Sequence, residues 1–338
     1  MAGTIIVSII IFGLLIFVHE LGHFSVAKWA KIRVLEFAIG FGKVLYAWEK
    51  GETRYSLRLF PLGGFCRLLG EDPDDQPLEG NFQEKSLPKK LAVIAAGSVA
   101  NFLLAIILLV LLFFFILGVP GTNSSRVGSV IPDSPAAVAG IRENDLIVDI
   151  DGVKMSDWDS VVRTINGNPG GEITLHIQRG QEDVFVSVVP EETDGKGLIG
   201  IAPSYKKYAF FPSVALALDY FFFWIKLIFV GFYQMIMRII PPEVAGPIGI
   251  VSVIGEVMQE GVSNLFSLTA IISINLGIIN LFPIPALDGS KLLFLLLEGI
   301  RGKPIDPHKE GIIHFIGFTF LILLMIFIAF QDITRLIF

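Results

Sequence analysis

The hydrophobic and polar positions of this chain form four long apolar stretches, over about residues 4–25, 91–118, 265–298 and 312–332. The first is uncharged up to Glu20, and the third is uncharged up to Asp288 and continues beyond it. A helix that crosses a bilayer needs about 20 predominantly apolar residues, so we expect four transmembrane helices. The first stretch lacks a basic start and a clean small-residue cleavage site, and we expect a retained span rather than a signal peptide.

A fifth apolar segment, residues 210–240, is interrupted by Asp219, Lys226 and Arg238. We interpret it as a helix that lies at the membrane interface or packs within the bundle. A fifth transmembrane helix is the alternative.

Residues 120–206 have a different pattern, in which apolar and polar residues alternate as they do in strands. Asp151-Gly152 separates two such runs, which predicts a β-hairpin. Ser156 or Asp157 is a candidate N-cap for a helix whose apolar face contains Trp158, Val161, Val162 and Ile165. We therefore expect an α+β domain at 120–206, inserted between membrane parts at 1–119 and 207–338.

Composition indicates the class of protein, and the distribution of charge indicates its orientation in the membrane. The 338 residues are 53% hydrophobic and 17% charged, with a mean hydropathy of +0.69, as in an integral membrane protein. Eleven Lys or Arg residues lie between positions 28 and 90, and the connector after the third stretch adds Arg301, Lys303 and Lys309. Because positive loops stay in the cytoplasm, we expect both termini and residues 120–264 on the outer face. The single cysteine, Cys66, excludes an internal disulfide.

Three titratable residues, His19, Glu20 and His23, lie inside the first apolar stretch, in the sequence HELGH. Residues i and i+4 share one face of a helix, so both imidazoles can bind a single cation. A catalytic zinc ion takes three protein ligands and keeps one position for water, and Glu20 is placed to take a proton from that water. A polar cap at a helix end is the alternative, but ionisable groups inside a membrane span usually mark function.

The third ligand must come from another span at the same depth, and Asp288 is the candidate. Pro283, Pro285 and Gly289 interrupt the helix around it, and irregular backbone at membrane depth occurs only where it is buried in protein or lines a cavity. His23 and Asp288 meet only if their spans run in the same direction, which requires an even number of reversals between them. Four spans satisfy this condition, whereas a further crossing at residues 210–240 does not.

These motifs resemble the site-2 protease family of intramembrane zinc metalloproteases, in particular the bacterial type with an extracytoplasmic PDZ domain. HELGHF and NLFPIPALDG match the two signatures of the family, GSVAN at 97–101 resembles the small-residue motif of its second span, and the resemblance covers nearly the whole chain. The resemblance implies that His19, His23 and Asp288 bind one Zn²⁺ ion and that Glu20 is the catalytic base. It also implies membrane-associated β-hairpin elements at about 36–70, and substrate contacts by Asn275, Asn280, Pro283 and Pro285.

One position departs from the usual pattern of the family. Ser290 and Lys291 follow the LDG sequence, where close relatives often have Gly-His. We expect no loss of catalysis from this difference.

The inserted domain resembles a PDZ domain through the sequences SPAAVAGIRENDLIVDIDG and GLIGI. The resemblance implies that Leu198, Ile199, Gly200 and Ile201 form a strand that binds extended peptide ends by strand addition. A folded spacer that only limits access sterically is an equally favoured alternative.

The leading hypothesis is an intramembrane endopeptidase of the bacterial inner membrane, with its active site near the cytoplasmic side in a polar cavity open to the cytoplasm. It would cleave single-span proteins, such as anti-sigma factors or signal-peptide remnants, after another protease has trimmed them. The alternatives are an inactive scaffold that presents the PDZ domain, which the intact ligand set disfavours, and a metal transporter, for which the chain has no inverted repeat. The expected partners are these substrates, the lipid bilayer and peptide C-termini at the PDZ domain, and we expect no nucleic acid.

Overall fold

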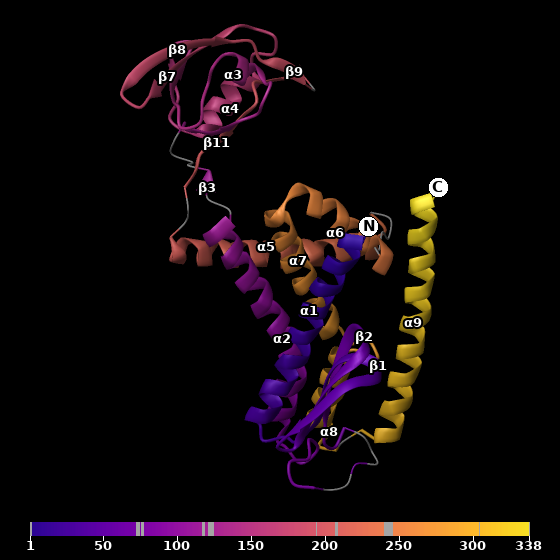
Figure 1. The fold of residues 1–338 in the computed structure, drawn as a ribbon. Helices are drawn as coiled ribbons and strands as arrows, with labels where there is room; N and C mark the ends of the chain where they lie inside the picture. The colour runs from indigo at the N-terminus through magenta and orange to yellow at the C-terminus, as the bar shows by residue number, and fades with distance from the viewer. Residues whose placement is uncertain are drawn as a thin grey trace. The chain divides into compact units, whose positions relative to one another are not determined.

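The computed structural model of the chain describes residues 2–71, 75, 78–116, 119–120, 125–193, 195–206, 209–239, 246–303 and 305–337. The chain divides into two compact units. The first is formed by Met1–Val110 and Ala217–Phe338, and the second by Leu111–Leu216. Figure 1 shows the ribbon and the labels of its elements.

The first unit is predominantly helical. Within the described residues, five helices are long and apolar enough to cross a membrane, at Gly3–Trp29, Leu87–Ile116, Phe210–Ile236, Val262–Leu281 and His308–Thr334. The third predicted stretch, 265–298, is not one helix, because it breaks between Leu281 and Asp288. The helices are α1 (Ala2–Trp29), α2 (Leu87–Leu111), α5 (Phe210–Ile236), α6 (Pro247–Glu260), α7 (Val262–Leu281), α8 (Asp288–Arg301) and α9 (Pro307–Ile337).

The contacts of α1 establish the directions of its neighbours. Near the end of α1, Gly22 lies against Ala96 and Ala100 of α2, whereas Leu104 of α2 packs near the earlier residues Ile11 and Leu15, so the two helices are antiparallel. Early residues of α7, including Leu265 and Leu268, join the same apolar cluster around Ile11. Because Asp288, just after α7, lies beside His19 and His23, α7 runs in the same direction as α1. This agrees with the even number of reversals that we expect between the two motifs.

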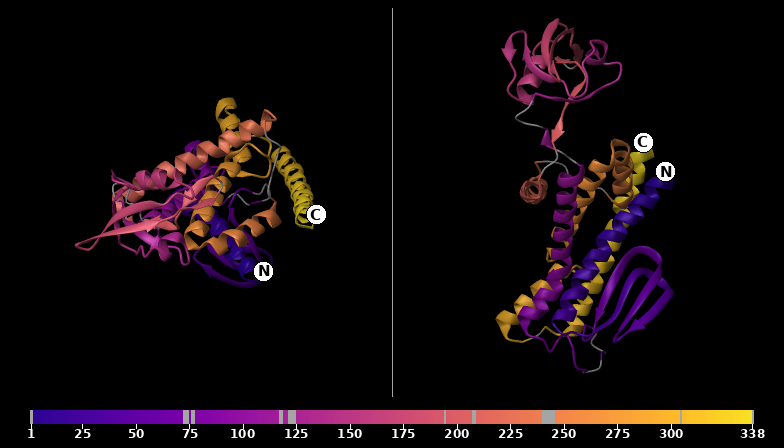
Figure 2. Two further views of the ribbon diagram at one scale, coloured as in Figure 1. Left: turned by 90° about the horizontal axis from the view of Figure 1, so that it is seen from above. Right: turned by 60° about the vertical axis from the view of Figure 1, so that its left-hand side comes forward.

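Helix α5 has a different orientation from its neighbours in this unit. Its segment from Ala217 onwards runs crosswise to α1, and the side views in Figures 1 and 2 show α5 lengthwise in one and nearly end-on in the other. Its length and composition still allow a crossing. The interfacial placement therefore stays a prediction, and its crosswise direction favours it.

A long antiparallel hairpin connects α1 to α2. It consists of β1 (Val34–Lys50) and β2 (Thr53–Leu68), which confirms the strands expected at 36–70 and joins them into one element. The base of the hairpin packs against the C-terminal end of α1 and the N-terminal part of α2. Together they form a core that includes Ile32, Val34 and Leu68. Further along the hairpin, Phe41, Tyr46, Trp48 and Phe60 are exposed aromatic residues, which suits a surface in contact with lipid.

The second unit contains the expected α+β fold. Its main sheet has the strand order β6-β5-β7-β8, and the buried side chains of Ile147, Ile150, Leu175 and Ile177 form its core with those of α4. Asp151 and Gly152, both at positive φ, form the predicted turn between β5 and β6. The elements of this unit, besides a π-helical turn at Leu112–Ile116, are β3 (Val119–Pro120), β4 (Val127–Val130), α3 (Pro135–Val138), β5 (Leu146–Ile150), β6 (Val153–Lys154), α4 (Trp158–Asn166), β7 (Ile173–Arg179), β8 (Glu182–Val188), β9 (Glu191–Thr193), β10 (Lys196–Leu198), β11 (Ile201–Pro203) and β12 (Tyr205–Lys206).

Two details of the sequence prediction in this unit are wrong. Asp157 is the N-cap of α4 as expected, but Val162 is 38% exposed and does not share the buried face of Trp158, Val161 and Ile165. The residues 198–201 are not one strand. Gly200 has φ +80°, a conformation that L side chains rarely adopt, and it turns the chain between β10 and β11, which pair with different partners.

A buried ion pair connects β5 with the end of β7. Asp145 is 1% exposed, and its carboxylate accepts hydrogen bonds from the backbone N–H of Arg142 at 2.8 Å and from Nε and Nη2 of Arg179 at 2.9 and 2.8 Å. Burial alone would raise the pKa of Asp145, but the hydrogen bonds from Arg179 and Arg142 outweigh it and lower the pKa.

The substitution Arg179→Met is expected to destabilise this unit by about 2–3 kcal/mol, because it leaves the Asp145 carboxylate buried without its main partner. Hydrogen exchange followed by mass spectrometry on the full chain should show β5 and β7 exchanging roughly 30- to 160-fold faster. Since the folded pKa of Asp145 is lowered, the stabilisation is complete above its unfolded pKa of about 3.9 and is lost as the pH falls through the folded value. The control is Arg163→Met on exposed α4 surface, and equal exchange in both variants would contradict the prediction.

Candidate metal centre

The two histidines of the HELGH sequence lie near the end of α1 and are buried. They are one turn apart, and their rings meet edge to face with centroids 4.8 Å apart. Their Nε2 atoms are 3.2 Å apart. The helix therefore presents two imidazole nitrogens to the same point, as the i, i+4 spacing predicts.

Asp288 reaches the same point from the other side of the chain. It is the first residue of α8 and follows the irregular segment Phe282–Leu287 that ends α7. Its Oδ2 lies 3.1 Å from Nε2 of His19 and 3.2 Å from Nε2 of His23. Among the residues that the structure describes, these three are the one group of His, Cys, Asp or Glu side chains arranged to hold a metal ion.

The spacing of these three atoms fits zinc. Zinc bonds of about 2.0–2.2 Å in a tetrahedron place the ligand atoms about 3.3–3.6 Å apart. The three separations of 3.1–3.2 Å are close to that value, and two imidazoles with one carboxylate are a zinc-type ligand set. The residues present therefore fit a zinc ion with one position left open.

The Nδ1 atoms of both histidines have partners outside the centre, and these partners orient each ring so that its Nε2 faces the centre. Nδ1–H of His23 donates to the carbonyl oxygen of Val93 at 2.8 Å, which fixes the tautomer with a free Nε2. Nδ1 of His19 lies 3.3 Å from the side-chain amide of Asn101, a buried residue whose Oδ1 has no hydrogen-bond partner. The oxygen and nitrogen of an asparagine side chain are assigned from the surrounding hydrogen bonds, so their positions can be exchanged. With the Asn101 amide turned over, the orphaned Oδ1 accepts from Nδ1–H of His19.

Glycines allow the backbone to approach the centre closely. A Cβ on Gly97 of α2 would lie 2.6 and 2.7 Å from Cε1 and Nε2 of His19, and closer still to Nε2 of His23. A Cβ on Gly289 would collide with the carbonyl groups of Leu281 and Phe282 at the end of α7. These positions explain why GSVAN and LDG contain glycine on either side of the ligands.

A cavity of about 330 Å³ surrounds the centre, and Glu20 lines it together with His19, His23 and Asp288. The last residues of β2, from Phe65 to Leu68, form another wall. Cys66 is part of this wall, and burial raises the pKa of its thiol. The cavity thus joins three metal-ligand atoms, a carboxylate and the edge of a hairpin.

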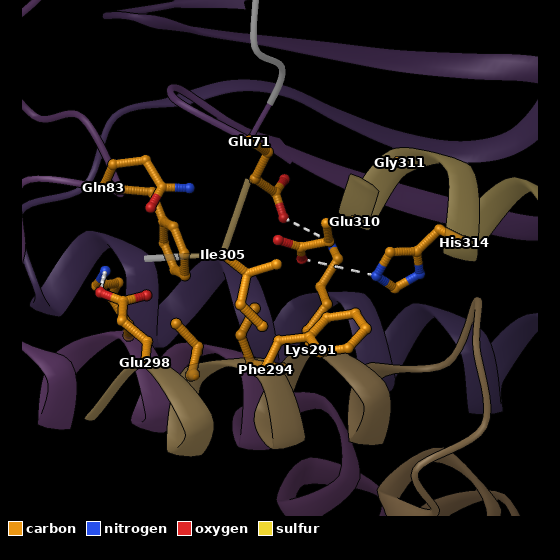
Figure 3. A pocket seen from close by; sticks show the side chains of 13 residues that line it. Glu71, Gln83, Lys291, Phe294, Glu298, Ile305, Glu310, Gly311 and His314 are labelled. Atoms are coloured by element: carbon orange, nitrogen blue, oxygen red, sulfur yellow. Dashed lines mark hydrogen bonds and ion pairs between the residues drawn. The ribbon is translucent and has the colours of Figure 1, made fainter. Parts of the chain in front are cut away.

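A second, larger cavity of about 520 Å³ lies beside the first (Figure 3), and Glu71, Ile94 and Lys291 line both. Charged pairs mark its walls. Nζ of Lys291 lies 2.9 Å from Oε1 of Glu71, and Nζ of Lys90 lies 2.8 Å from Oε1 of Glu298. Between these pairs the lining of the larger cavity is mainly apolar, and a polar cavity open to the cytoplasm stays a prediction.

The other predicted site residues lie elsewhere. Asn275 and Asn280 are on α7, and Pro283 and Pro285 are in the segment that leads to Asp288, but none of the four lines the cavity around the histidines. Leu198, Ile199, Gly200 and Ile201 belong to the second unit, where Ile199 is buried in the core and α4 packs against β10.

The sequence predicts no individual role for several residues near the centre. Asn101 stands out only as part of the GSVAN motif, and Lys291 only as a departure from the family pattern. Glu71 and His314 have no local spacing signal, because each is one polar residue in a loop or helix. An unexpected basic residue three positions after Asp288 was the one available signal for Lys291, since i and i+3 share a helix face.

Comparison with known proteins gives a consistent family. The sequence profile described as Peptidase family M50 matches residues 7–324. A zinc metalloprotease RasP of Geobacillus kaustophilus is 32% identical, with 98% of both chains covered. A regulator of sigma-W protease RasP of Bacillus subtilis is 34% identical, with 99% of both chains covered, and a putative zinc metalloprotease of Clostridium acetobutylicum is 34% identical over 98% of this chain and 97% of its own.

Solved PDZ domains match about a quarter of the chain. The PDZ domain of an SdrC-like protein from Listeria monocytogenes is 24% identical, covers 24% of this chain and 87% of its own, and gives a TM-score of 0.22. The corresponding domain from Listeria innocua is 25% identical, covers 26% and 100%, and gives a TM-score of 0.23. Scores this low carry no argument about fold, so the PDZ assignment stays a prediction.

The substitution Gly97→Ala is expected to disrupt the metal centre, because the added methyl group would collide with both imidazoles. We expect loss of bound zinc and a peptidase activity that is at least about 100-fold lower. A displacement of about 1 Å at a catalytic site reduces the rate by about this factor. Zinc content by mass spectrometry and cleavage of a model substrate measure both. The matched control is Gly13→Ala on α1, where a Cβ has open space. Normal zinc content in Gly97→Ala would show that the close approach is not required.

Proposed function

The chain belongs to peptidase family M50 and is a zinc metalloprotease, and we propose that it cleaves peptide bonds within the transmembrane segments of single-span membrane proteins. The observation that carries this proposal is the convergence of His19, His23 and Asp288 with Glu20 in one cavity of a unit built from membrane-type helices. A soluble peptidase has no need to place such a centre there, because ionisable groups at membrane depth are costly.

We propose that one zinc ion per chain is held by Nε2 of His19, Nε2 of His23 and Oδ2 of Asp288. When bound, zinc supplies Lewis acidity toward the scissile carbonyl group and favours deprotonation of a water molecule. Glu20 takes the proton from the attacking water and returns it to the leaving amine. Val93 and Asn101 hold the histidine rings in the orientation that keeps Nε2 toward the centre.

A substrate helix must be unwound before it can be cut, since its peptide bonds are enclosed in i to i−4 hydrogen bonds. We propose that the substrate segment pairs with the edge of the β1–β2 hairpin, because residues 65–68 of β2 form a wall of the catalytic cavity. Asn280 would then donate to backbone groups freed by unwinding, together with contacts from Asn275, Pro283 and Pro285. These contacts require movement, because none of the four lines the cavity.

The proposed location is the bacterial inner membrane, with the inserted domain and both termini outside and the metal centre near the cytoplasmic side. The charge distribution supports this orientation. The name of the Bacillus subtilis relative, a regulator of sigma-W protease, supports an anti-sigma factor as one candidate substrate. We propose that the inserted domain is a PDZ domain that selects pre-trimmed substrates, by binding peptide ends at residues 198–201 or by steric exclusion.

The substitution Glu20→Gln separates catalysis from metal binding. We expect unchanged zinc content and a cleavage rate about 10²- to 10⁴-fold lower, the usual contribution of a general base. His19→Ala and Asp288→Ala should instead lose zinc. Cleavage of a model transmembrane substrate in liposomes provides the rate, and Glu256→Gln, an exposed carboxylate on α6, provides the control. Full activity of Glu20→Gln would overturn the catalytic assignment.

The topology is tested by single cysteines in a Cys66→Ser background with a membrane-impermeant thiol reagent. We expect Gln234→Cys, near the end of α5, to be labelled from the same side as Val138→Cys in the inserted domain, where the side chain is 84% exposed. Glu84→Cys, in the positively charged loop before α2, should be labelled from the opposite side. Labelling of Gln234→Cys together with Glu84→Cys would instead establish α5 as a crossing.

A further inference from the structure

The segment Phe282–Leu287, which leads to Asp288, has one backbone donor that neither the segment nor the preceding helix α7 satisfies. Pro283 and Pro285 have no N–H. The N–H groups of Phe282, Ile284 and Leu287 donate to the carbonyl oxygens of Ile279, Phe282 and Ile284. The N–H of Ala286 instead donates to Nδ1 of His314 on α9, at 3.1 Å. All backbone N–H groups of this loop are therefore hydrogen-bonded only because a side chain from another helix accepts from Ala286.

Ala286 also has an unusual backbone conformation. Its φ of +78° lies in the left-handed region, which a residue with a Cβ adopts only when its surroundings hold it there. The residue is two positions before Asp288. A change of its backbone conformation would redirect the chain at the point where the carboxylate leaves the loop.

Two side chains flank the ring of His314. Its Nε2 lies 3.7 Å from Oε1 of Glu310, one turn earlier on α9, which is too far for a hydrogen bond. The ring of Phe294 on α8 meets it edge-on at 5.8 Å between centroids. Figure 3 shows these side chains around the larger cavity. Because Nδ1 accepts from Ala286, the proton of the neutral imidazole is on Nε2, toward Glu310.

Gly317 makes a second contact between the same two segments. It lies three residues after His314 on the same face of α9, and a Cβ there would lie 2.7 and 2.8 Å from the carbonyl oxygen and carbon of Pro285. The backbone of α9 thus touches Pro285 while its histidine bonds to the next residue. Further along α9, the side chains of Leu323, Ile326 and Phe327 are exposed, and Asp332 accepts hydrogen bonds from the backbone N–H groups of Gly246 and Gly249. Among the described residues, the contact with Pro285 is therefore one of two places where α9 is attached to the unit.

We propose that α9 positions the metal centre, with His314 and Gly317 holding Pro285 and Ala286 so that Asp288 meets His19 and His23. His314 is a positioning residue, since it acts through the loop and does not line the catalytic cavity. The inference rests on the proposed metal centre. It adds a requirement that the HELGH and LDG motifs do not contain, namely a hydrogen-bond acceptor on the last helix.

The test measures Co²⁺ binding to the metal-free full chain in detergent, which needs no substrate. His314→Leu removes the acceptor, and we expect Co²⁺ affinity about 10- to 100-fold lower, the range found when the support of a metal ligand is lost, with an altered visible absorption spectrum. His314→Asn places an amide oxygen near the position of Nδ1 and should restore affinity and spectrum. The control is His308→Leu, an exposed histidine on the same helix, which should bind Co²⁺ like the natural chain.

Native Co²⁺ affinity and spectrum in His314→Leu would overturn the inference while leaving the catalytic role of Glu20 intact, because Glu20→Gln tests that role separately. Failure of the natural chain to bind Co²⁺ would overturn the metal centre and this inference together. If His314→Leu does not fold, Gly317→Ala decides, since its methyl group pushes on Pro285 from the same helix. Its control is Gly311→Ala, where a Cβ has open space, and equal Co²⁺ binding by both would overturn the inference.

Discussion

The need to place three polar ligand atoms at one point within an apolar helix bundle governs the rest of the first unit. His19 and His23 are buried, and Asp288 is close enough to both that each group is the partner of the others. Unpaired, such groups would oppose folding, because burial of a polar or charged side chain without a partner is costly. The two helices and the irregular segment that carry these groups must therefore meet within a few ångströms.

Small residues make this meeting possible. Gly22 of α1 lies against the backbone of α2, and Gly97 of α2 lies against the imidazoles of α1, so the two helices can cross closely. Gly289 allows α8 to begin directly against the end of α7. Membrane helices generally associate through such close contacts, because lipid gives no hydrophobic drive for their packing. The result is a centre in which the histidine rings have little room to rotate, as a metal site with fixed ligand directions requires.

The surroundings of the centre are polar on one side and apolar on the other. Ion pairs of Lys291 with Glu71 and of Lys90 with Glu298 line the neighbouring cavity, while the hairpin extends exposed aromatic residues such as Trp48 and Phe60. Hydrolysis inside a membrane needs both water and an extended substrate strand. The cavity provides a polar volume next to Glu20, and the hairpin provides a strand edge beside it.

Elements with strong local signals can be predicted from the sequence alone. The apolar stretches predict the long helices, and the Asp151-Gly152 turn and the capped α4 follow from turn and cap chemistry. The i, i+4 histidines predict two of the three ligands of the proposed metal centre. These features depend on residues close together in the chain, whose period or spacing is visible in one dimension. Asp288 was found by the requirement of a third ligand at matching depth.

Features that join distant residues depend on how the chain folds in three dimensions. The tertiary structure ended α7 at Leu281 and started α8 at Asp288, placed Val162 away from the core, and turned the chain at Gly200 within an expected strand. It also brought Asn101 to His19 and His314 to Ala286, across 82 and 28 positions. A single polar residue on a helix has no spacing partner, and its role depends on which segment packs against it, so no local pattern could have revealed these supports.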